Sequence, residues 1–338
     1  MIIKELTLDN SLNSSKIAPN FYEEVVNCFQ EFKTLWHRLQ TIPFQPSSEL
    51  EMFLVDLTQE QTGAFKIRGA TTSIGEFLKN RQPHTDSLVV ASSGNFGIAV
   101  AVMAAKFALN ATIFMPVSSP IQKQDYIKST GAKVVITNDG EARQKALEFT
   151  RKNSHCFFLD GAQWPAFRGN GTFLLELLQL GLLTNKKTAL VLPLGSGSLA
   201  IPTGLILHQV RPNAELIAVE PLTHCKFLAK YVQNVQPTWG ITLAEGVALH
   251  QLPQLSDRLL PEIVNVIFGV TESEIITAIC YLWKNCQLKA EASAVLPIAA
   301  YLANPSFFSR YQQVYFFITG GNIEDDLFHK ILRGNVTQ

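Results

Sequence analysis

A loop of small residues over 195–198, with the sequence GSGS, joins an apolar run at 189–194 to an apolar helical stretch. Residues without bulk let backbone N–H groups approach an anion, and the N-terminus of the following helix adds a favourable dipole. The loop therefore predicts a phosphate site. The local pattern leaves the ligand open, because G-x-G-x-x-A with Glu220 further along also satisfies the dinucleotide fingerprint, and a tight turn without a ligand has the same composition.

A second reactive group is Lys66, which follows Phe65 in the apolar-leaning segment EQTGAFKIRGA at 60–70. A lysine in apolar surroundings has its ammonium form disfavoured, and this is the condition for Schiff-base chemistry. On this segment alone, a solvated lysine near Arg68 is the more frequent arrangement. The catalytic interpretation of Lys66 therefore depends on the rest of the chain.

The elements that would position these groups alternate along the chain from about residue 50. Short apolar runs predict strands, and stretches with helical periodicity lie between most of them. The runs are EMFLVDL, SLVVASS, ATIFMPV, AKVVIT, CFFLDG, ALVLPLG, ELIAVEP, EIVNVIFGV and VYFFITGG, and the helical patterns include 95–109, 140–152, 171–183 and 272–288. Strands that are apolar throughout and separated by helices predict an α/β fold with parallel sheets covered on both faces.

In such open sheets the ligand binds at the carboxyl ends of the strands, so the residues just after each apolar run are informative. Three of these loops are small and polar: SSGN at 92–95, the GSGS loop, and TGGN at 319–322. Turn-making alone does not require so many small polar residues. The three loops are therefore candidates for ligand contacts.

Composition narrows the class of ligand. The chain has 338 residues, enough for two domains, with 47% hydrophobic and 17% charged residues and 28 basic against 28 acidic side chains. With this balance the protein has no net charge that would attract nucleic acid or anionic lipid, so small neutral or zwitterionic ligands are expected. The five cysteines form no C-x-x-C pair and the histidines have no metal-binding spacing, so neither a disulfide framework nor a metal site is predicted.

The N-terminal segment lacks a basic region followed by an apolar core, so a secretory signal is not expected. The longest apolar stretch, at 97–117, is interrupted by Lys106 and Asn110 and predicts a core helix that runs into a strand. A soluble cytoplasmic protein without membrane partners is therefore expected.

Five segments in this order resemble the pyridoxal-phosphate enzymes of fold type II, a group also called tryptophan synthase beta-like. Within that group they are most similar to the serine/threonine dehydratase and serine racemase branch. The segments are GAFKIRGA at 63–70, SSGN at 92–95, GSGSL at 195–199, EP at 220–221 and TGGN at 319–322. With further matching segments such as LAEGVAL and AEASAVLPIAA, the resemblance extends over roughly residues 40 to 325.

This resemblance implies a fold and a domain organisation. Two open, twisted, mainly parallel sheets would have helices on both faces, with the active site between two domains. The large cofactor-binding domain would comprise residues 1–84 and 164–338, and a small mobile domain would comprise residues 85–163.

The resemblance also implies a role for each matched residue. Lys66 would carry pyridoxal 5'-phosphate as a Schiff base and act as the catalytic base at the substrate Cα. Asn95 would hydrogen-bond the ring hydroxyl of the cofactor, and Thr319 its pyridine nitrogen. The cofactor phosphate would lie in the loop formed by Gly195, Ser196, Gly197, Ser198 and Leu199. The substrate carboxylate would be held by Ser92, Ser93, Gly94 and Asn95.

The hydroxyl of Thr319 selects the chemistry, because a neutral partner does not stabilise a protonated pyridinium. Charge generated at Cα is then better discharged by expelling a β-substituent. The preferred interpretation is therefore a lyase that converts a β-hydroxy amino acid, such as serine or threonine, to a 2-oxo acid and ammonia.

Three other activities remain as alternatives. One is a β- or γ-replacement enzyme of the same fold, similar to cysteine synthase or threonine synthase. Another is an amino-acid racemase, if the hydroxyl of Ser93 reaches the face of Cα opposite Lys66 and acts as a second catalytic acid or base. The last, from a different class, is a nicotinamide oxidoreductase built on the fingerprint that begins at Gly195.

Several positions depart from the family pattern. Ala64 replaces the usual serine of the lysine motif, the phosphate loop has serines instead of a run of glycines, and Phe96 stands where histidine is frequent. Members of the branch that bind a divalent ion use the acid of the EP step, here Glu220, and a second acid six residues on, where this chain has Lys226. A positive charge there opposes cation binding, and Glu220 would then only end a strand.

The family commonly dimerises, so a homodimer that acts on a small amino-acid substrate is expected. The apolar N-terminal segment at 21–39 is a candidate partner helix. Because the chain ends soon after the TGGN loop, neither a C-terminal regulatory domain nor control by an end product bound to it is expected.

Overall fold

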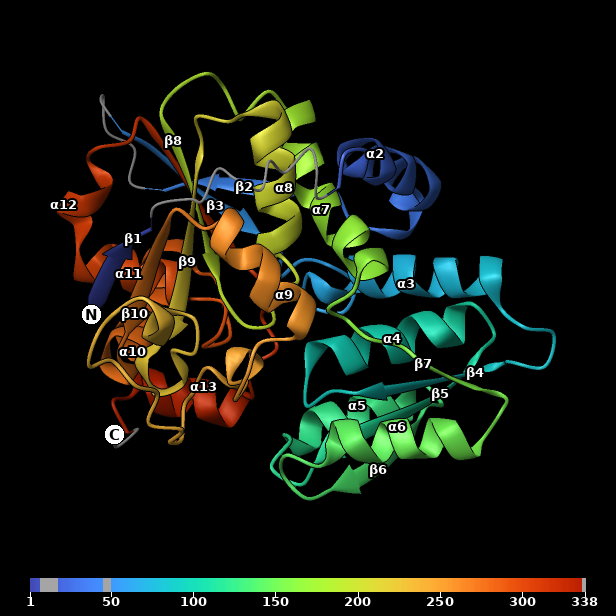
Figure 1. Ribbon diagram of the computed structural model, residues 1–338. Coiled ribbons are helices and arrows are strands. Elements are labelled where there is room, and N and C mark those ends of the chain that lie inside the picture. Colours follow the sequence, from blue (N-terminus) through green and yellow to red (C-terminus); the bar gives the residue numbers. More distant parts are fainter. Residues whose placement is uncertain (7–17, 45–49, 336–338) are drawn as a thin grey trace.

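The strands form two sheets, which confirms the prediction of an α/β fold with two mainly parallel sheets (Figure 1). The computed structural model describes residues 1–6, 18–44 and 50–335. Within this part the strands are β1 Ile2–Glu5, β2 Gln40–Pro43, β3 Glu51–Asp56, β4 Ser87–Ala91, β5 Asn110–Pro116, β6 Lys133–Thr137, β7 Cys156–Phe158, β8 Thr188–Pro193, β9 Glu215–Pro221, β10 Val266–Val270 and β11 Gln313–Ile318.

The larger sheet has the strand order β1-β10-β9-β8-β11-β3-β2, and the smaller sheet has the order β6-β5-β4-β7. Neighbouring strands are parallel except at the two edges of the larger sheet. There β1 pairs with β10, and β2 with β3, in antiparallel orientation. The parallel centre brings the carboxyl ends of β3, β8, β9 and β11 to one edge, where a ligand of an open α/β sheet is expected.

The helices of the described part are α2 Phe21–Phe32, α3 Lys66–Asn80, α4 Asn95–Lys106, α5 Ile121–Ser129, α6 Ala142–Lys152, α7 Trp164–Gln179, α8 Ala200–Val210, α9 Gln254–Leu259, α10 Glu272–Cys286, α11 Leu296–Ala303, α12 Pro305–Phe308 and α13 Asp325–Leu332. In Figure 1 the smaller sheet lies to the lower right with α4, α5 and α6 around it, and α3 runs above it. Short 3-10 turns join several of these elements, among them η4 at Glu245–Val247.

Both faces of the larger sheet are buried, which explains why its strands are apolar at every position. Along β8 and β11, alternate residues such as Leu190 and Tyr315 belong to a core that includes α2, α7 and α8. Their neighbours Val191 and Phe316 belong to a second core on the opposite face, which includes α10, α11 and α13. Successive strand side chains point to opposite faces, so two covered faces require apolar residues throughout.

The helix predicted at 171–183 begins and ends earlier, at Trp164–Gln179. Pro165 lies in its first turn, where a missing N–H costs nothing, and Gly181 adopts φ +69° just after the helix. The edge strands β1 and β2 lie outside the predicted strands, and α3 lies outside the predicted helical patterns. The stretch at 97–117 divides into α4 and β5, as predicted.

None of the helices in the described part is long and apolar enough to cross a membrane. All five cysteines are free thiols. Burial raises the pKa of Cys28 to about 12, so this thiol is unreactive at neutral pH.

Candidate functional site

Lys66 is the first residue of α3, and its amine reaches the loop at 195–199, which precedes α8 and is the predicted phosphate site. Its Nζ donates a hydrogen bond to Ser198 Oγ at 2.6 Å and lies 4.3 Å from the centroid of the Phe65 ring. Burial lowers the pKa of Lys66 to about 8, while the carboxylate of Glu291 opposes this shift. The lysine is therefore not the solvated charge that its segment alone favoured. It is an amine that is partly unprotonated near neutral pH.

The chain that leads into Lys66 is hydrogen-bonded to the end of β11. The N–H of Phe65 donates to the carbonyl of Thr319 at 3.1 Å, and the N–H of Gly321 donates to the carbonyl of Gly63 at 2.9 Å. Gly63 has φ +69°, and a Cβ there would lie 2.2 Å from Asn322 Oδ1. These contacts place Thr319, which is 4% exposed, beside the segment that carries the lysine.

The backbone amides of the loop at 195–199 have no hydrogen-bond acceptor among the described residues, whereas its carbonyls are bonded from behind. Ser256 Oγ donates to the carbonyl of Ser196 at 2.6 Å, and Asn170 Nδ2 donates to the carbonyl of Ser198 at 2.8 Å. Gly197 adopts φ +79°, which only glycine tolerates without strain. A row of amides at the start of α8 is suited to bind a phosphate.

The loop at 92–95 opens α4, and the side chains of Ser92 and Asn95 are already hydrogen-bonded. Ser92 Oγ accepts from the N–H groups of Gly94 and Gly97 at 3.3 and 3.1 Å. Asn95 Nδ2 donates to Glu291 Oε1 at 2.6 Å, and Asn95 Oδ1 accepts from Asn322 at 2.8 Å. The hydroxyl of Ser93 makes no hydrogen bond within the part of the chain that the structure describes. The loops at 92–95 and 319–322 therefore meet through Asn95 and Asn322.

Glu291 is a site residue that sequence reasoning did not identify. It is 8% exposed, and burial raises its pKa while the nearby Lys123 opposes this shift. Gly320 allows its close approach, because a Cβ on Gly320 would lie 2.7 Å from Glu291 Oε1. Lys123, on α5, also forms an ion pair with Glu245 in η4 and so links the smaller sheet to the larger one. In the sequence, Glu291 is part of the segment AEASAVLPIAA, which matches the family pattern but indicates no role for this residue.

Glu220 does more than end a strand. Its carboxylate is fully buried, forms an ion pair with Lys226, and accepts hydrogen bonds from the N–H groups of Phe227 and Leu228. Glu220 is the penultimate residue of β9, so it ends a strand as expected, and its side chain has this buried ion pair in addition. With both oxygens engaged inside the protein, Glu220 is also unable to bind a ribose, as a dinucleotide fingerprint would require.

Asn170 is a second residue that sequence reasoning missed. It is 1% exposed on α7 and joins α3 to the phosphate loop, because its Oδ1 accepts from the N–H of Gly69 at 3.1 Å while its Nδ2 donates to Ser198. Its hydrogen-bond partners are distant from it in the sequence, so no local sequence pattern identifies it.

Replacing Asn170 by alanine is expected to lower the free energy of unfolding by about 1–3 kcal/mol, because the Gly69 N–H and the Ser198 carbonyl lose their partner in a buried place. Urea unfolding of the two proteins measures this difference. The control is Asn80→Ala at the exposed end of α3, whose side chain bonds only within its own helix. Equal losses in both variants would contradict the role given to Asn170.

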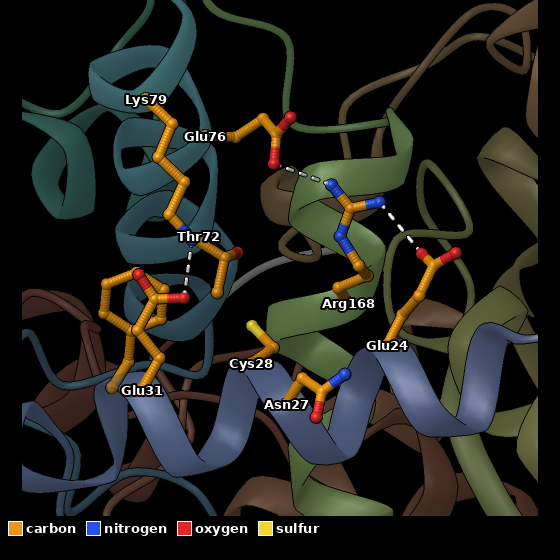
Figure 2. A pocket seen from close by; sticks show the side chains of 9 residues that line it. Glu24, Asn27, Cys28, Glu31, Thr72, Glu76, Lys79 and Arg168 are labelled. Atoms are coloured by element: carbon orange, nitrogen blue, oxygen red, sulfur yellow. Dashed lines mark hydrogen bonds and ion pairs between the residues drawn. The ribbon is translucent and has the colours of Figure 1, made fainter.

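Figure 2 shows a pocket between α2, α3 and α7 that lies apart from this site. It has a volume of about 310 Å³, and none of the predicted site residues lines it. Arg168 pairs with Glu24 and Glu76, and Lys79 pairs with Glu31, so each charged side chain that lines the pocket has a partner of opposite charge. The reactive groups of the chain are therefore gathered around Lys66 and not in this pocket.

Comparisons with known proteins agree with this geometry. The family model described as "Pyridoxal-phosphate dependent enzyme" matches residues 37–320. L-threonine ammonia-lyase of Thermotoga maritima is 26% identical, over 92% of this chain and 77% of the relative. Serine racemase of Mus musculus is 28% identical, over 78% of this chain and 79% of the relative. The solved structure of the processed form of threonine deaminase isoform 2 from Solanum lycopersicum has a TM-score of 0.80 at 20% identity, covering 98% of this chain and 91% of that chain.

Proposed function

Since the chain belongs to the family of pyridoxal-phosphate dependent enzymes, we propose that it is an ammonia-lyase acting on a β-hydroxy amino acid. The reaction expels the β-hydroxyl group and yields a 2-oxo acid and ammonia. The observation that carries the proposal is the Lys66 amine, which has a pKa of about 8 and is bonded to the phosphate loop through Ser198. Such an amine can both hold an aldehyde and exchange a proton at neutral pH.

The residues around Lys66 fit pyridoxal phosphate. The N–H groups at 195–199 lack acceptors among the described residues and stand at the N-terminus of α8, which suits the phosphate. A partly unprotonated lysine suits the aldehyde, and the buried hydroxyl of Thr319 suits the pyridine nitrogen. When bound, the cofactor supplies an electron sink for the carbanion that forms at the substrate Cα.

In this proposal the groups around the substrate have the following roles. Lys66 Nζ removes the proton from the substrate Cα and holds it. The loop at 92–95 binds the substrate carboxylate, and the N–H groups of Ser93 and Asn95 are available for this because they donate to no other described residue. Thr319 offers a neutral hydroxyl, which favours loss of the β-substituent over transamination.

The racemase alternative requires a second acid or base on the opposite face of Cα. Ser93 is the candidate, but within the described residues nothing hydrogen-bonds its hydroxyl or raises its basicity. Elimination needs only the one base that Lys66 provides. This difference supports elimination over racemisation as the main activity.

The test is to incubate the purified protein and pyridoxal phosphate with L-serine, L-threonine and their D-forms. The visible absorption spectrum and the released 2-oxo acid are measured in the same samples. We expect the absorption band to shift with one of the L-forms and the oxo acid to accumulate. A band that none of them shifts would overturn elimination from these substrates, and inversion of the amino acid without oxo acid would favour the racemase.

A pH dependence follows from the lowered pKa of Lys66. Only the unprotonated amine attacks an aldehyde, so the rate of cofactor uptake by the apo-protein is expected to rise about tenfold per pH unit and to level off above about pH 8. Stopped-flow absorbance measures this rate. The carboxylate of Glu291 raises the pKa of Lys66, so in Glu291→Gln this pKa is expected to be lower and the plateau to begin at lower pH. A rate that still rises near pH 10 would indicate an ordinary lysine.

We further propose the domain division at 1–84 with 164–338 and at 85–163, a homodimer, and a cytoplasmic location. The smaller sheet supports the division, since its strands β4, β5, β6 and β7 all fall within 85–163. The candidate partner helix at 21–39 contains α2, whose inner face packs against α7 and α8.

A further inference from the structure

A buried ion pair lies directly behind the phosphate loop. The side chains of Lys226 and Glu220 are 4% and 0% exposed, and their Nζ and Oε1 atoms are 3.0 Å apart. Lys226 Nζ also donates to the carbonyl of Leu194 at 3.4 Å and to the carbonyl of Val247 at 3.3 Å. The three hydrogen atoms of one ammonium group thus reach oxygen atoms of three separate segments: the end of β8, the end of β9 and the turn η4.

These three oxygens form the kind of donor set that binds a hard cation. One carboxylate and two backbone carbonyls carry a single negative charge in a place without solvent, and such a set needs a positive charge at its centre. The ammonium of Lys226 supplies it. Burial raises the pKa of Glu220, while Lys226 and the amides of Phe227 and Leu228 oppose this shift.

Two of the three contacts end at residues that adjoin Gly195, the first residue of the loop at 195–199. Leu194 directly precedes Gly195, and Val247 packs against Gly195 so closely that a Cβ on the glycine would lie 3.2 Å from Val247 Cα. Lys226 therefore ties the two segments that meet at Gly195. A change in its charge or length acts on the position where the row of free amides begins.

We propose that Lys226 is a built-in cation that positions the phosphate loop, and that removing its side chain opens a site which a small inorganic cation refills. Lys226 is a positioning residue, because it acts on the loop through Leu194 and Val247. Its effect on cofactor affinity rests on the proposed function, whereas the cation site behind the loop does not.

The first experiment measures the melting temperature of the apo-protein and of Lys226→Ala. Alanine leaves Glu220 buried without a partner, so a melting temperature about 4–7 °C lower is expected. Magnesium chloride or ammonium chloride is then added, with choline chloride at equal ionic strength as the reference salt. We expect either small cation to raise the melting temperature of Lys226→Ala in a concentration-dependent way and to leave the wild type unchanged.

The second experiment measures cofactor affinity by absorbance titration. Lys226→Ala is expected to bind pyridoxal phosphate about tenfold more weakly, and added cation is expected to restore most of this loss. The matched control is Lys230→Ala, because Lys230 is exposed and its ion pair with Asp257 is not part of the buried cluster. The control is expected to match the wild type in both experiments.

A double variant separates positioning from charge compensation. Glu220→Gln with Lys226→Met replaces the ion pair by neutral groups of similar size, so no buried charge is left unpaired. We expect this variant to fold, to ignore added cations and still to bind the cofactor about tenfold more weakly. Affinity equal to the wild type would overturn the positioning role.

The remaining outcomes are equally decisive. If neither cation stabilises Lys226→Ala, or if both stabilise the wild type to the same extent, the cation site is overturned. If the wild type neither binds pyridoxal phosphate nor releases a 2-oxo acid while Lys226→Ala is still rescued by a cation, the proposed function fails and the cation site stands.

Discussion

Replacement of Lys66 by alanine is expected to reduce the release of 2-oxo acid by about 10⁴-fold or more. The variant loses the amine that holds the cofactor and, with it, the only base assigned to the substrate Cα. A positioned general base alone contributes about 10²–10⁴-fold, so a loss below about 10²-fold would be inconsistent with both roles. The measurement is kcat/KM for oxo acid release at saturating pyridoxal phosphate.

A covalent readout accompanies this activity measurement. Borohydride reduction of the wild-type holoenzyme, followed by peptide mass analysis, is expected to place the cofactor on the peptide that contains Lys66. In Lys66→Ala the cofactor is expected to leave on dialysis. Modification of a different lysine in the wild type would contradict the assignment.

The matched control is Lys79→Ala. Lys79 lies near the other end of the same helix and forms an exposed ion pair with Glu31. Exposed pairs contribute little, so its loss is expected to leave kcat/KM and cofactor retention unchanged. A comparable decrease in both variants would indicate damage to α3 and not loss of a catalytic amine.

The fold could be predicted from the sequence wherever burial was complete. Strands such as β8 and β11 are covered on both faces, and their unbroken apolar runs follow from that fact. The edge strands β1 and β2 have four residues each, of which two are exposed and two are partly buried, so they carry no comparable pattern. Their antiparallel pairing depends on the neighbouring strand and is not encoded in their own residues.

The candidate site could be predicted in part for a similar reason. The loops at 92–95, 195–199 and 319–322 all follow parallel strands, and small polar residues at strand ends are visible without knowledge of contacts. Asn170 and Glu291 could not be found in this way, because what matters is their partner in space. Glu291 is 196 positions from Asn95 in the chain, and Asn170 is 101 positions from Gly69.

Arg68 shows where local reasoning fails most clearly. The sequence places it two residues after Lys66, where a pair of solvated basic residues is the ordinary expectation. In the structure its side chain is 0% exposed. It pairs with Glu60, eight residues earlier in the same segment, and with Glu176 on α7, and neither spacing marks these residues as its partners.

Replacement of Arg68 by methionine is expected to lower the free energy of unfolding by about 3–5 kcal/mol. The guanidinium lies 2.8 Å from Glu60 Oε1 and 2.5 Å from Glu176 Oε2, and its central carbon lies 3.8 Å from the centroid of the Phe173 ring. Methionine fills much of the same volume but leaves both carboxylates without a cation. Urea unfolding of the apo-protein measures the loss, because the apo-protein keeps cofactor affinity out of the comparison.

Arg168→Met is the matched control for this variant. Arg168 on α7 also bridges two glutamates, Glu24 and Glu76, but all three side chains reach solvent. A loss below about 1 kcal/mol is expected there. Losses of equal size in the two variants would contradict the importance of burial at Arg68.

The pH dependence of Arg68→Met distinguishes unpaired buried charge from lost packing. Burial raises the pKa of Glu60, and Arg68 opposes that shift, so the pKa is expected to rise further in the variant. A carboxyl group with a raised pKa binds a proton in the folded state at a higher pH than in the unfolded state. Protonation therefore stabilises the folded protein as the pH falls. The deficit of the variant is therefore expected to be largest near about pH 8 and smaller near about pH 5. The double variant Glu60→Gln with Arg68→Met removes one of the two unpaired carboxylates and is expected to recover part of the lost unfolding free energy at about pH 8. A loss of unfolding free energy that depends neither on pH nor on Glu60 would instead assign the effect to packing against Phe173.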